Sequence, residues 1–507
     1  MAEDRRIRQS LFSIFSLIPY KLLPSPSGLF NMVWKGSIEM PTLSHKAGRA
    51  AFSVAVDAVL KKTNKDRNKA FHSLVDLAER FMGDSMPLTS YDAARKMIDD
   101  PESKWMLYIN RLLDEVSPNV LKTAALNFGY EAGLCGTKKV RKMREQEQCN
   151  IPWTILIDPT SACNLHCTGC WAAEYGHKLN LTYDELDSII TQGKELGIYF
   201  YMYTGGEPLV RKKDIIKLCE KHSDCEFNAF TNATLVDEEF CRDMERVGNL
   251  TLSISLEGFE QVNDMRRGEG DFHSVMAAMD MLKKYGLIFG TSICYTSKNI
   301  ETVTSDEFLD MIIDKGCRFT WYFHYMPVGN SASVDLLPSV EQREYMYHRV
   351  REVRAMQGGK PIFAMDFQND GEFVGGCIAG GRNYCHINAN GDVEPCVFIH
   401  YSGANIRDMS LLDSLKQPLF MAYRDNQPFN NNHLRPCPML ENPELLQKMV
   451  SQTGAKSTDL ESPESAEHLC GKCAAYAANW AGEAEHLWND GPHHEPKHTN
   501  YKGDYTK

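Results

Sequence analysis

Apolar and polar positions follow two different patterns along the 507 residues, and the change falls near residue 153. Before it, apolar residues recur three and four positions apart, the spacing of helices with one buried face. Pro41, Pro87 and Pro101 interrupt this pattern, as proline does between helices. We therefore predict a helical region over residues 1–150, with helices at residues 50–60, 67–81, 90–98 and 104–113.

Six strand-like runs follow, separated by segments with helical periodicity. Thr182 and Glu185 open one of these segments as a Thr-x-x-Glu capping box, which marks a helix start. Strands that alternate with helices form a parallel sheet, and six strands are too few for a closed eight-stranded barrel. The predicted fold class is therefore α/β, a partial (β/α)6 barrel, with strands at residues 153–158, 198–204, 225–231, 250–256, 287–295 and 317–326.

These patterns divide the chain into four parts. Residues 1–150 form the helical region and residues 151–335 the barrel. Residues 336–450 are rich in glycine and cysteine, and residues 451–507 comprise a helix and a polar tail that we expect to be disordered. Functional side chains should lie on the loops that follow the carboxyl ends of the barrel strands.

Composition excludes several classes of protein. Apolar residues make up 43% of the chain and charged residues 24%, which is typical of globular proteins and not of disordered or collagen-like chains. Asp and Glu number 67 against 55 for Lys and Arg, a net charge of −12. An acidic chain has no general attraction for phosphate backbones, so we expect no nucleic-acid partner. No apolar run approaches the roughly 20 residues of a membrane span.

The N-terminus contains the best candidate for a targeting segment. A basic start precedes an apolar stretch at residues 11–23, but Pro24 and Pro26 follow where a signal peptide would have a small-residue cleavage site. We predict a helix docked on the protein itself, and contact with a membrane surface through residues 1–33 is the alternative. Without an export signal the expected location is cytoplasmic, peripheral to the membrane in the second case. Clustered cysteines in that compartment more often bind metal or act in catalysis than form disulfides.

Three cysteines follow the first predicted strand of the barrel. Cys163, Cys167 and Cys170 have the spacing C-x3-C-x2-C. Three thiolates on one short loop can hold three irons of a 4Fe–4S cube and leave the fourth iron open, as catalytic metal centres do. The alternative is a zinc site in which His166 supplies a further ligand.

A glycine pair ends the second predicted strand, in the sequence Gly205-Gly206-Glu207-Pro208. Two glycines allow backbone groups to approach a ligand closely, and Pro208 turns the chain away from the sheet. Because this turn follows one strand after the cysteine loop, at the same edge of the sheet, it indicates a ligand site beside the metal.

Together and in this order, CNLHCTGC and YTGGEP resemble the motifs of the radical S-adenosylmethionine (radical SAM) enzymes, and the resemblance covers residues 152–329. It implies a 4Fe–4S cluster whose open iron binds the amino and carboxylate groups of S-adenosylmethionine (SAM). One electron, from a reductant such as flavodoxin or ferredoxin, would cleave SAM to methionine and a 5′-deoxyadenosyl radical. That radical would abstract a hydrogen atom from an organic substrate.

The resemblance also implies contacts with SAM at individual positions. The glycine turn would receive the methionine amino group, and Arg267 would pair with its carboxylate. Glu257 replaces the aspartate usual in the S-x-D-G motif. Gly169 stands where an aromatic residue usually precedes the third cysteine, which leaves Trp171 as the candidate to cover the adenine or the cluster. The implied cofactor-binding residues are Gly205, Gly206, Glu207, Asn232, Ser255, Arg267 and Val328.

A second group of cysteines lies in the C-terminal third. Cys377, Gly391 and Cys396 form C-x13-G-x4-C, which resembles the opening of the SPASM or twitch extension that binds auxiliary 4Fe–4S clusters in radical SAM enzymes. Asn390 and Gly391 favour a tight turn, and the hairpin that they predict would present Cys385 and Cys396 to one metal.

We expect one auxiliary cluster, because the full extension continues with four closely spaced cysteines and only Cys470 and Cys473 are present here. Cys470 could replace any of the preferred ligands or pair with Cys473 in a separate site. Structural zinc is the alternative to iron–sulfur. The preferred ligands are Cys377, Cys385, Cys396 and Cys437.

The predicted function is that of a radical SAM enzyme acting on a small molecule, a lipid or a cofactor precursor. The alternatives are a peptide or protein maturase and a non-catalytic zinc-binding scaffold. The N-terminal region lacks the strand pattern of the winged-helix domain with which peptide maturases recognise peptides, which favours the first. The remaining barrel cysteines fall within strand or helix patterns, so we predict core positions for Cys219, Cys225, Cys241, Cys294 and Cys317.

Overall fold

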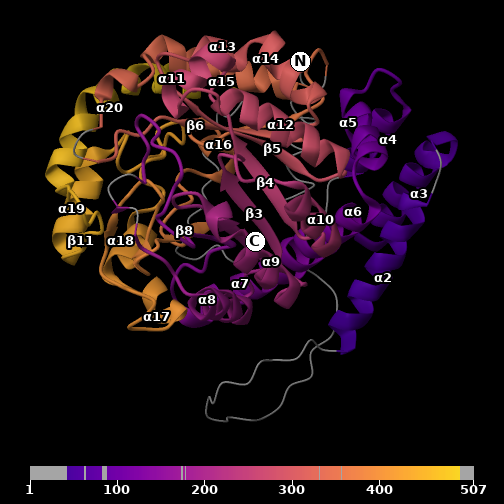
Figure 1. Cartoon of the computed structure of the whole chain (residues 1–507), viewed down its shortest axis with the longest axis horizontal. Helices are drawn as coiled ribbons and strands as arrows, with labels where there is room; N and C mark the ends of the chain where they lie inside the picture. The colour runs from indigo at the N-terminus through magenta and orange to yellow at the C-terminus, as the bar shows by residue number, and fades with distance from the viewer. Residues whose placement is uncertain are drawn as a thin grey trace.

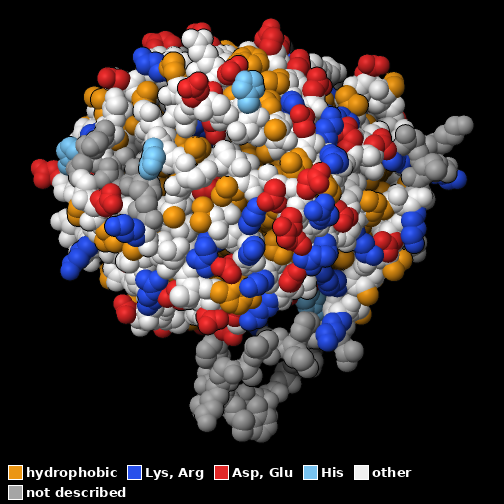
Figure 2. Space-filling model, viewed as in Figure 1, with side chains coloured by type: hydrophobic (Ala, Val, Ile, Leu, Met, Phe, Trp, Pro, Cys, Tyr) orange, Lys and Arg blue, Asp and Glu red, His pale blue; other side chains and the backbone are white. Residues whose placement is uncertain are grey.

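The computed structural model describes residues 43–61, 64–82, 88–172, 175–176, 178–329, 332–355 and 357–491. The predicted apolar segment at the N-terminus and the polar tail lie outside these ranges. The N-terminal helices and the last helices of the chain lie on opposite sides of a central sheet (Figure 1). Acidic and basic side chains are interspersed over the face shown in Figure 2. None of the described helices is long and apolar enough to cross a membrane.

Helices build the described region before the barrel, as predicted. The last three of them are not evident in the sequence pattern, and one is a π-helix, η2, that packs against the sheet. The indole of Trp153 donates to the Ala132 carbonyl of η2 at 3.0 Å, and the Asn127 amide donates to the Cys225 carbonyl at 2.9 Å. The helices are α2 (Leu43–Leu60), α3 (Asn64–Met82), α4 (Leu88–Asp99), α5 (Lys104–Glu115), α6 (Pro118–Ala124), η2 (Ala125–Gly136) and α7 (Thr137–Glu147).

Within the described residues the main sheet has nine strands, in the order β7-β6-β5-β4-β3-β2-β1-β8-β9. Every neighbouring pair is parallel except β8 and β9. The six predicted strands are β1 to β6, so the partial barrel is confirmed, and β7 and β8 extend it at its two edges. The strands are β1 (Thr154–Ile157), β2 (Phe200–Tyr203), β3 (Glu226–Thr231), β4 (Leu250–Ser255), β5 (Phe289–Tyr295), β6 (Phe319–His324), β7 (Phe363–Asp366), β8 (Tyr384–Ile387) and β9 (Val393–Glu394).

The cysteine-rich C-terminal region contributes three strands, β7, β8 and β9, to the barrel sheet. β8 pairs in parallel with β1, with Cys385 beside Ile155. β8 and β9 form the predicted hairpin, and Gly391 in its turn has a φ of 87°, a conformation that favours glycine. Strands from the segments that carry the two cysteine groups therefore belong to one continuous sheet.

Helices alternate with the strands after β1. Thr182 caps α8, and its side chain and that of Glu185 form the predicted capping box. The helices within the barrel are α8 (Tyr183–Leu196), η4 (Pro208–Arg211), α9 (Lys212–Lys221), α10 (Glu238–Val247), α11 (Glu260–Arg267), α12 (Asp271–Lys284), α13 (Ile300–Thr304), α14 (Asp306–Asp314), η5 (Val334–Leu336) and α15 (Val340–Arg354). The C-terminal part adds α16 (Gly371–Val374), β10 (Tyr401–Ser402), α17 (Leu411–Leu415), α18 (Pro418–Asn426), α19 (Pro443–Thr453), β11 (Lys456–Ser457) and α20 (Ala466–Asp490).

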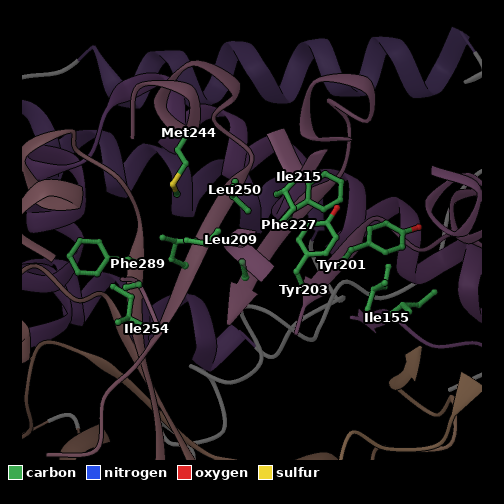
Figure 3. Close-up of a cluster of buried hydrophobic side chains, with 14 of the residues drawn as sticks. Ile155, Tyr201, Tyr203, Leu209, Ile215, Phe227, Met244, Leu250, Ile254 and Phe289 are labelled. Atoms are coloured by element: carbon green, nitrogen blue, oxygen red, sulfur yellow. The ribbon is translucent and has the colours of Figure 1, made fainter. Parts of the chain in front are cut away.

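Alternation of side chains along the strands separates two apolar cores. The outer core lies between the sheet and its helices and includes Ile155, Tyr201 and Phe227 (Figure 3). The inner core includes their strand neighbours Leu156 and Met202, with side chains from the C-terminal region. Four of the five barrel cysteines occupy the outer core as predicted, namely Cys219, Cys225, Cys241 and Cys317.

Candidate functional site

The first cysteine group lies on the loop after β1, at the carboxyl edge of the sheet. The thiols of Cys163, Cys167 and Cys170 are half-buried. The pKa of Cys163 is raised to about 11, chiefly by burial, and the nearby Cys167 and Cys170 thiols act in the same direction. The Thr168 N–H donates to the Arg266 carbonyl at 2.9 Å, which fastens the loop to α11. The fold thus brings the three predicted thiols together.

The three loop thiols do not all lie within 4.8 Å of one another, as the ligand atoms of one tetrahedral ion would. A tetrahedral zinc ion with Zn–S bonds of about 2.3 Å holds its sulfurs about 3.8 Å apart. In the described part of the chain, three ligand atoms lie within 4.8 Å of one another only in His45, Glu131 and Cys135. The loop thiols are therefore set too widely for one ion, and His166 is exposed.

The glycine turn after β2 packs directly against the cysteine loop. Gly206 N–H donates to the Thr160 carbonyl at 3.0 Å, and Glu207 N–H donates to the Ala162 carbonyl at 2.8 Å. Gly205 has a φ of 102°, and a Cβ there would lie 2.5 Å from the Thr160 oxygen. Glycine is therefore required here because two backbone segments approach each other closely. This approach fixes the turn beside the thiols.

The Glu207 carboxylate is used within the protein. It accepts hydrogen bonds from Leu209 N–H at 2.9 Å, the Thr231 hydroxyl at 2.7 Å and Asn232 N–H at 2.8 Å. Burial raises the pKa of Glu207 to about 7, against the opposing effect of these donors. The Asn232 side chain in turn donates to Asn164 on the cysteine loop at 2.9 Å. The carboxylate thereby holds the end of β3 to the turn and leaves only backbone groups of the turn for a ligand.

Two arginines at the end of α11 face the cysteine loop. Arg267 lies 3.9 Å from the Cys167 sulfur and donates to Glu257 Oε1 at 2.6 Å, and Arg266 donates to the same oxygen. The Glu257 side chain is 1% exposed, and its Oε2 has no hydrogen-bond partner. A buried carboxylate oxygen without a partner is costly, so Oε2 can accept a hydrogen bond from a polar ligand beside the thiols.

The inner face of β4 and β5 also borders the cysteine loop. Ser255 pairs with Ser292 across these strands, and both are half-buried. Cys294, two residues on, is also half-buried and belongs to neither apolar core, so the predicted core position for it is wrong. Burial raises the pKa of Cys294 to about 11, which keeps the thiol protonated at neutral pH; Arg266 opposes this shift. Val328, after β6, is 7% exposed and lies in the inner core.

Aromatic side chains line the barrel interior from one cysteine group to the other. The rings of Phe230 and Trp321 are stacked with their centroids 5.3 Å apart, and the ring centroids of Phe323 and Phe367 are also 5.3 Å apart. Phe398, two residues after Cys396, continues the row at 6.4 Å from Phe367 and 6.3 Å from Trp171. Most of these rings are only half-buried, although they lie on the inner face of the sheet. Trp171 thus turns towards the C-terminal region.

Three cysteines of the second group converge beyond this row. Burial raises the pKa of Cys437, and Glu441, Cys377 and Cys396 are near enough to raise it further. The Tyr384 hydroxyl lies 2.7 Å from the Cys396 sulfur, and the N–H of Leu440 lies 3.4 Å from the Cys437 sulfur. Hydrogen bonds to the sulfur atoms are one of the features that tune iron–sulfur clusters.

The structure removes Cys385 from the expected ligand set. Cys385 follows Tyr384 on β8, so its side chain points to the opposite face of the sheet. It is fully buried in the outer core with Ile155 and Ile387. Burial alone raises its pKa, without a contribution from another thiol. A cysteine at this position packs as a small apolar residue.

Cys470 and Cys473 lie one turn apart on α20 and belong to the inner core together with Cys396. Burial is the main cause that raises the pKa of Cys473 to about 12, and Cys470 acts in the same direction. Cys470 also acts electrostatically on Tyr423, as do Cys377, Cys396 and Cys437. The pair therefore borders the converging cysteines.

A buried ion cluster that sequence reasoning missed joins the two parts of the site. The ring of His386 on β8 lies between Glu394, 2.6 Å from Nδ1, and Asp158, 2.9 Å from Nε2. Burial acts to lower the pKa of His386, but the two carboxylates raise it to about 10. Glu394 also accepts from Tyr175 at 2.8 Å. No local signal reveals this cluster, because its members come from segments far apart in the sequence.

This cluster predicts a pH-dependent contribution to stability. The pKa of His386 is higher in the folded protein than its ordinary value of about 6.5, so its charge stabilises the fold fully below pH ~6.5. This contribution is lost as pH rises towards 10. The difference in thermal midpoint between the wild type and His386→Gln should therefore be largest at pH 6 and shrink towards pH 10. A difference that stays constant with pH, or an equal trend for the exposed His348→Gln control, would contradict this.

Two family models match the chain. The model of the radical SAM superfamily matches residues 157–312, and an iron–sulfur cluster-binding domain, SPASM, matches residues 377–438. The second match begins at Cys377 and includes Cys396 and Cys437.

Curated relatives and solved structures agree with these matches. The AdoMet-dependent heme synthase of Methanosarcina barkeri is 24% identical over 286 residues, which cover 51% of this chain and 80% of that protein. The mycofactocin maturase MftC of Mycolicibacterium smegmatis is 28% identical over 263 residues, which cover 49% of this chain and 65% of that protein. The crystal structure of Streptococcus suis SuiB bound to S-adenosylmethionine has a TM-score of 0.50 at 16% identity, covering 83% of this chain and 92% of that one. At this identity the likeness shows a shared fold.

Proposed function

Because the chain belongs to the radical SAM superfamily and carries a C-terminal SPASM iron–sulfur domain, we propose that it modifies an apolar small molecule held inside the barrel. Cys163, Cys167 and Cys170 hold the catalytic 4Fe–4S cluster in this proposal. When bound, the cluster and SAM supply a 5′-deoxyadenosyl radical that starts the removal of a hydrogen atom from the substrate. The observation that carries the proposal is that the loop with the three thiols, the glycine turn and the arginine pair are bonded together at one edge of the sheet.

The residues around the thiols bind and orient SAM. Arg267, beside Cys167, pairs with the methionine carboxylate, and backbone groups of Gly205, Gly206 and Glu207 receive the amino group. Ser255 binds the ribose, and Val328 lines the adenine. Asn232 acts indirectly, because its side chain donates a hydrogen bond to Asn164 and holds the cysteine loop in place. The unpartnered Glu257 Oε2 supports a polar ligand here.

One auxiliary cluster is held by Cys377, Cys396 and Cys437, with Cys470 as the fourth ligand and Cys473 behind it. The mutual influence of the first three thiols and the position of Cys470 support this set. We retain residues 151–335 as the catalytic barrel and residues 336–450 as the auxiliary part. They act as one unit, since β8 and β9 complete the barrel sheet.

The aromatic row inside the barrel supports an apolar substrate. Rings such as Trp321 and Phe323 offer flat apolar contact area and few hydrogen bonds for a peptide backbone. In the described part of residues 43–151 the structure has helices and no strand, unlike a winged-helix peptide-recognition domain. The heme synthases among the relatives also support a cofactor precursor.

A fractionated extract tests the class of substrate. Organic-solvent and aqueous peptide fractions of cells that make the protein are added separately to the reduced enzyme with SAM. We expect the organic fraction to increase 5′-deoxyadenosine formation about tenfold or more, since substrate binding usually couples to SAM cleavage. An increase with the peptide fraction alone would instead favour a peptide maturase, the class to which the relative MftC belongs.

A further inference from the structure

Cys294 is a thiol in the cofactor site to which the proposed function assigns no task. It is the sixth residue of β5, and its neighbours Ile293 and Tyr295 face the outer core. Alternation along the strand therefore turns Cys294 to the inner face, where it is half-buried.

Cys294 lies beside the cysteine loop. Arg266, Glu257, Arg267 and Cys170 act electrostatically on Cys294, and Cys294 acts in turn on Tyr325, the residue directly after β6. Tyr325 also contacts the loop, since a Cβ at Gly169 would lie 3.0 Å from its ring. Cys294 and the cysteine loop are therefore neighbours at this end of the barrel.

An independent observation indicates that a ligand lies next to this thiol. Glu257 is almost fully buried, its Oε1 is bonded to both arginines, and its Oε2 has no partner. Glu257 and Cys294 are held together by Asn299, whose amide donates to both of their backbone carbonyls at 3.1 Å. Arg267 links the Glu257 carboxylate to the Cys167 sulfur. A polar group of the ligand that satisfies Oε2 would therefore lie in the same part of the site as Cys294.

We propose that Cys294 is a catalytic hydrogen-atom relay, which gives its S–H hydrogen to the 5′-carbon of the 5′-deoxyadenosyl radical and then takes a hydrogen atom from the substrate. This rests on the proposed function. In the first step the S–H bond breaks and a C–H bond forms, so the unpaired electron moves from carbon to sulfur without transfer of charge. The step is downhill, because an S–H bond is weaker than a primary C–H bond. In the second step the substrate C–H bond breaks and the S–H bond re-forms, so no further oxidant or reductant is needed.

Solvent deuterium tests this relay without knowledge of the substrate, because thiol hydrogens exchange with water. The anaerobic holoenzyme is given SAM and dithionite in D2O, and the 5′-deoxyadenosine is analysed by mass spectrometry. We expect one deuterium in most of the product from the wild type and from Cys241→Ala, a control in the outer core. Cys294→Ser and Cys294→Ala should each keep their iron and lose this label.

Two results would overturn the proposal in distinguishable ways. Unlabelled 5′-deoxyadenosine from the wild type, or equal labelling in both Cys294 variants, would exclude the relay and leave the proposed function standing. Absence of 5′-deoxyadenosine would overturn the proposed function and the relay with it.

Alkylation gives a readout that does not depend on turnover. The oxidised holoenzyme is treated with iodoacetamide, and labelling of individual cysteines is followed by peptide mass spectrometry. SAM at ten times its Kd should slow the labelling of Cys294 about tenfold, because only about a tenth of the sites remain free. Labelling of half-buried Cys135, on η2, should not change. Equal labelling of Cys294 with and without SAM would contradict a position beside the cofactor.

Discussion

Replacing Cys163, Cys167 and Cys170 together by alanine is expected to abolish 5′-deoxyadenosine formation and to remove about four of about eight irons per chain. The three thiols share one loop, which is fastened by its backbone to the glycine turn and to α11. Their loss should therefore empty this site and leave the sheet intact. Iron and sulfide analysis of protein purified without oxygen, with product detection by mass spectrometry, measures both effects.

The matched control is Cys219→Ala/Cys225→Ala/Cys241→Ala, which removes three thiols from the outer core of the same barrel. It is expected to keep about eight irons, even if the cavities lower the thermal midpoint. Full iron in the loop variant, or loss of half of the iron in this control, would show that the catalytic cluster is held elsewhere.

The second large effect is expected at the other end of the aromatic row. Replacing Cys377, Cys396 and Cys437 by alanine should also lower the iron content from about eight to about four per chain, because this removes three of the four ligands of one cube. The loop thiols remain, so SAM binding should persist. Equilibrium dialysis with labelled SAM and iron analysis measure the two expectations.

The variant Cys385→Ala distinguishes the ligand set that the structure supports from the set that the cysteine spacing suggests. It removes a thiol that lies within the same motif but packs in the outer core. We expect it to retain about eight irons. A loss of about four irons on this single change would contradict the ligand set proposed here and restore the set that the sequence suggests.

The fold could largely be predicted from the sequence, because long apolar runs and helix starts such as Thr182 and Glu185 carry local signals. The pairing of β7 with β6 and of β8 with β1 could not be predicted, because it joins segments that are far apart along the chain. The π-helix η2 could not be recognised from the sequence pattern. Its contacts with Trp153 and the Cys225 carbonyl join distant parts of the chain and leave no local signal.

The site could be predicted only where spacing carries the information. The loop cysteines and the glycine turn form compact motifs, and the fold brings them together. Spacing could not assign Cys385 and Cys294 to a face, because side chains alternate along a strand and a shift of one residue exchanges the faces. Cys385 then proves to face the helices and Cys294 the cofactor site. His386 has no motif at all, since Asp158 and Glu394 meet it only in the folded chain.

The most direct test is a single experiment on the wild type. The protein is purified and reconstituted without oxygen, its iron, sulfide and zinc are measured, and dithionite and SAM are added. We predict about eight irons and eight sulfides per chain, little zinc, and formation of 5′-deoxyadenosine and methionine in equal amounts. Zinc in place of iron, with no 5′-deoxyadenosine, would contradict radical chemistry at Cys163, Cys167 and Cys170 and would make both cysteine groups structural.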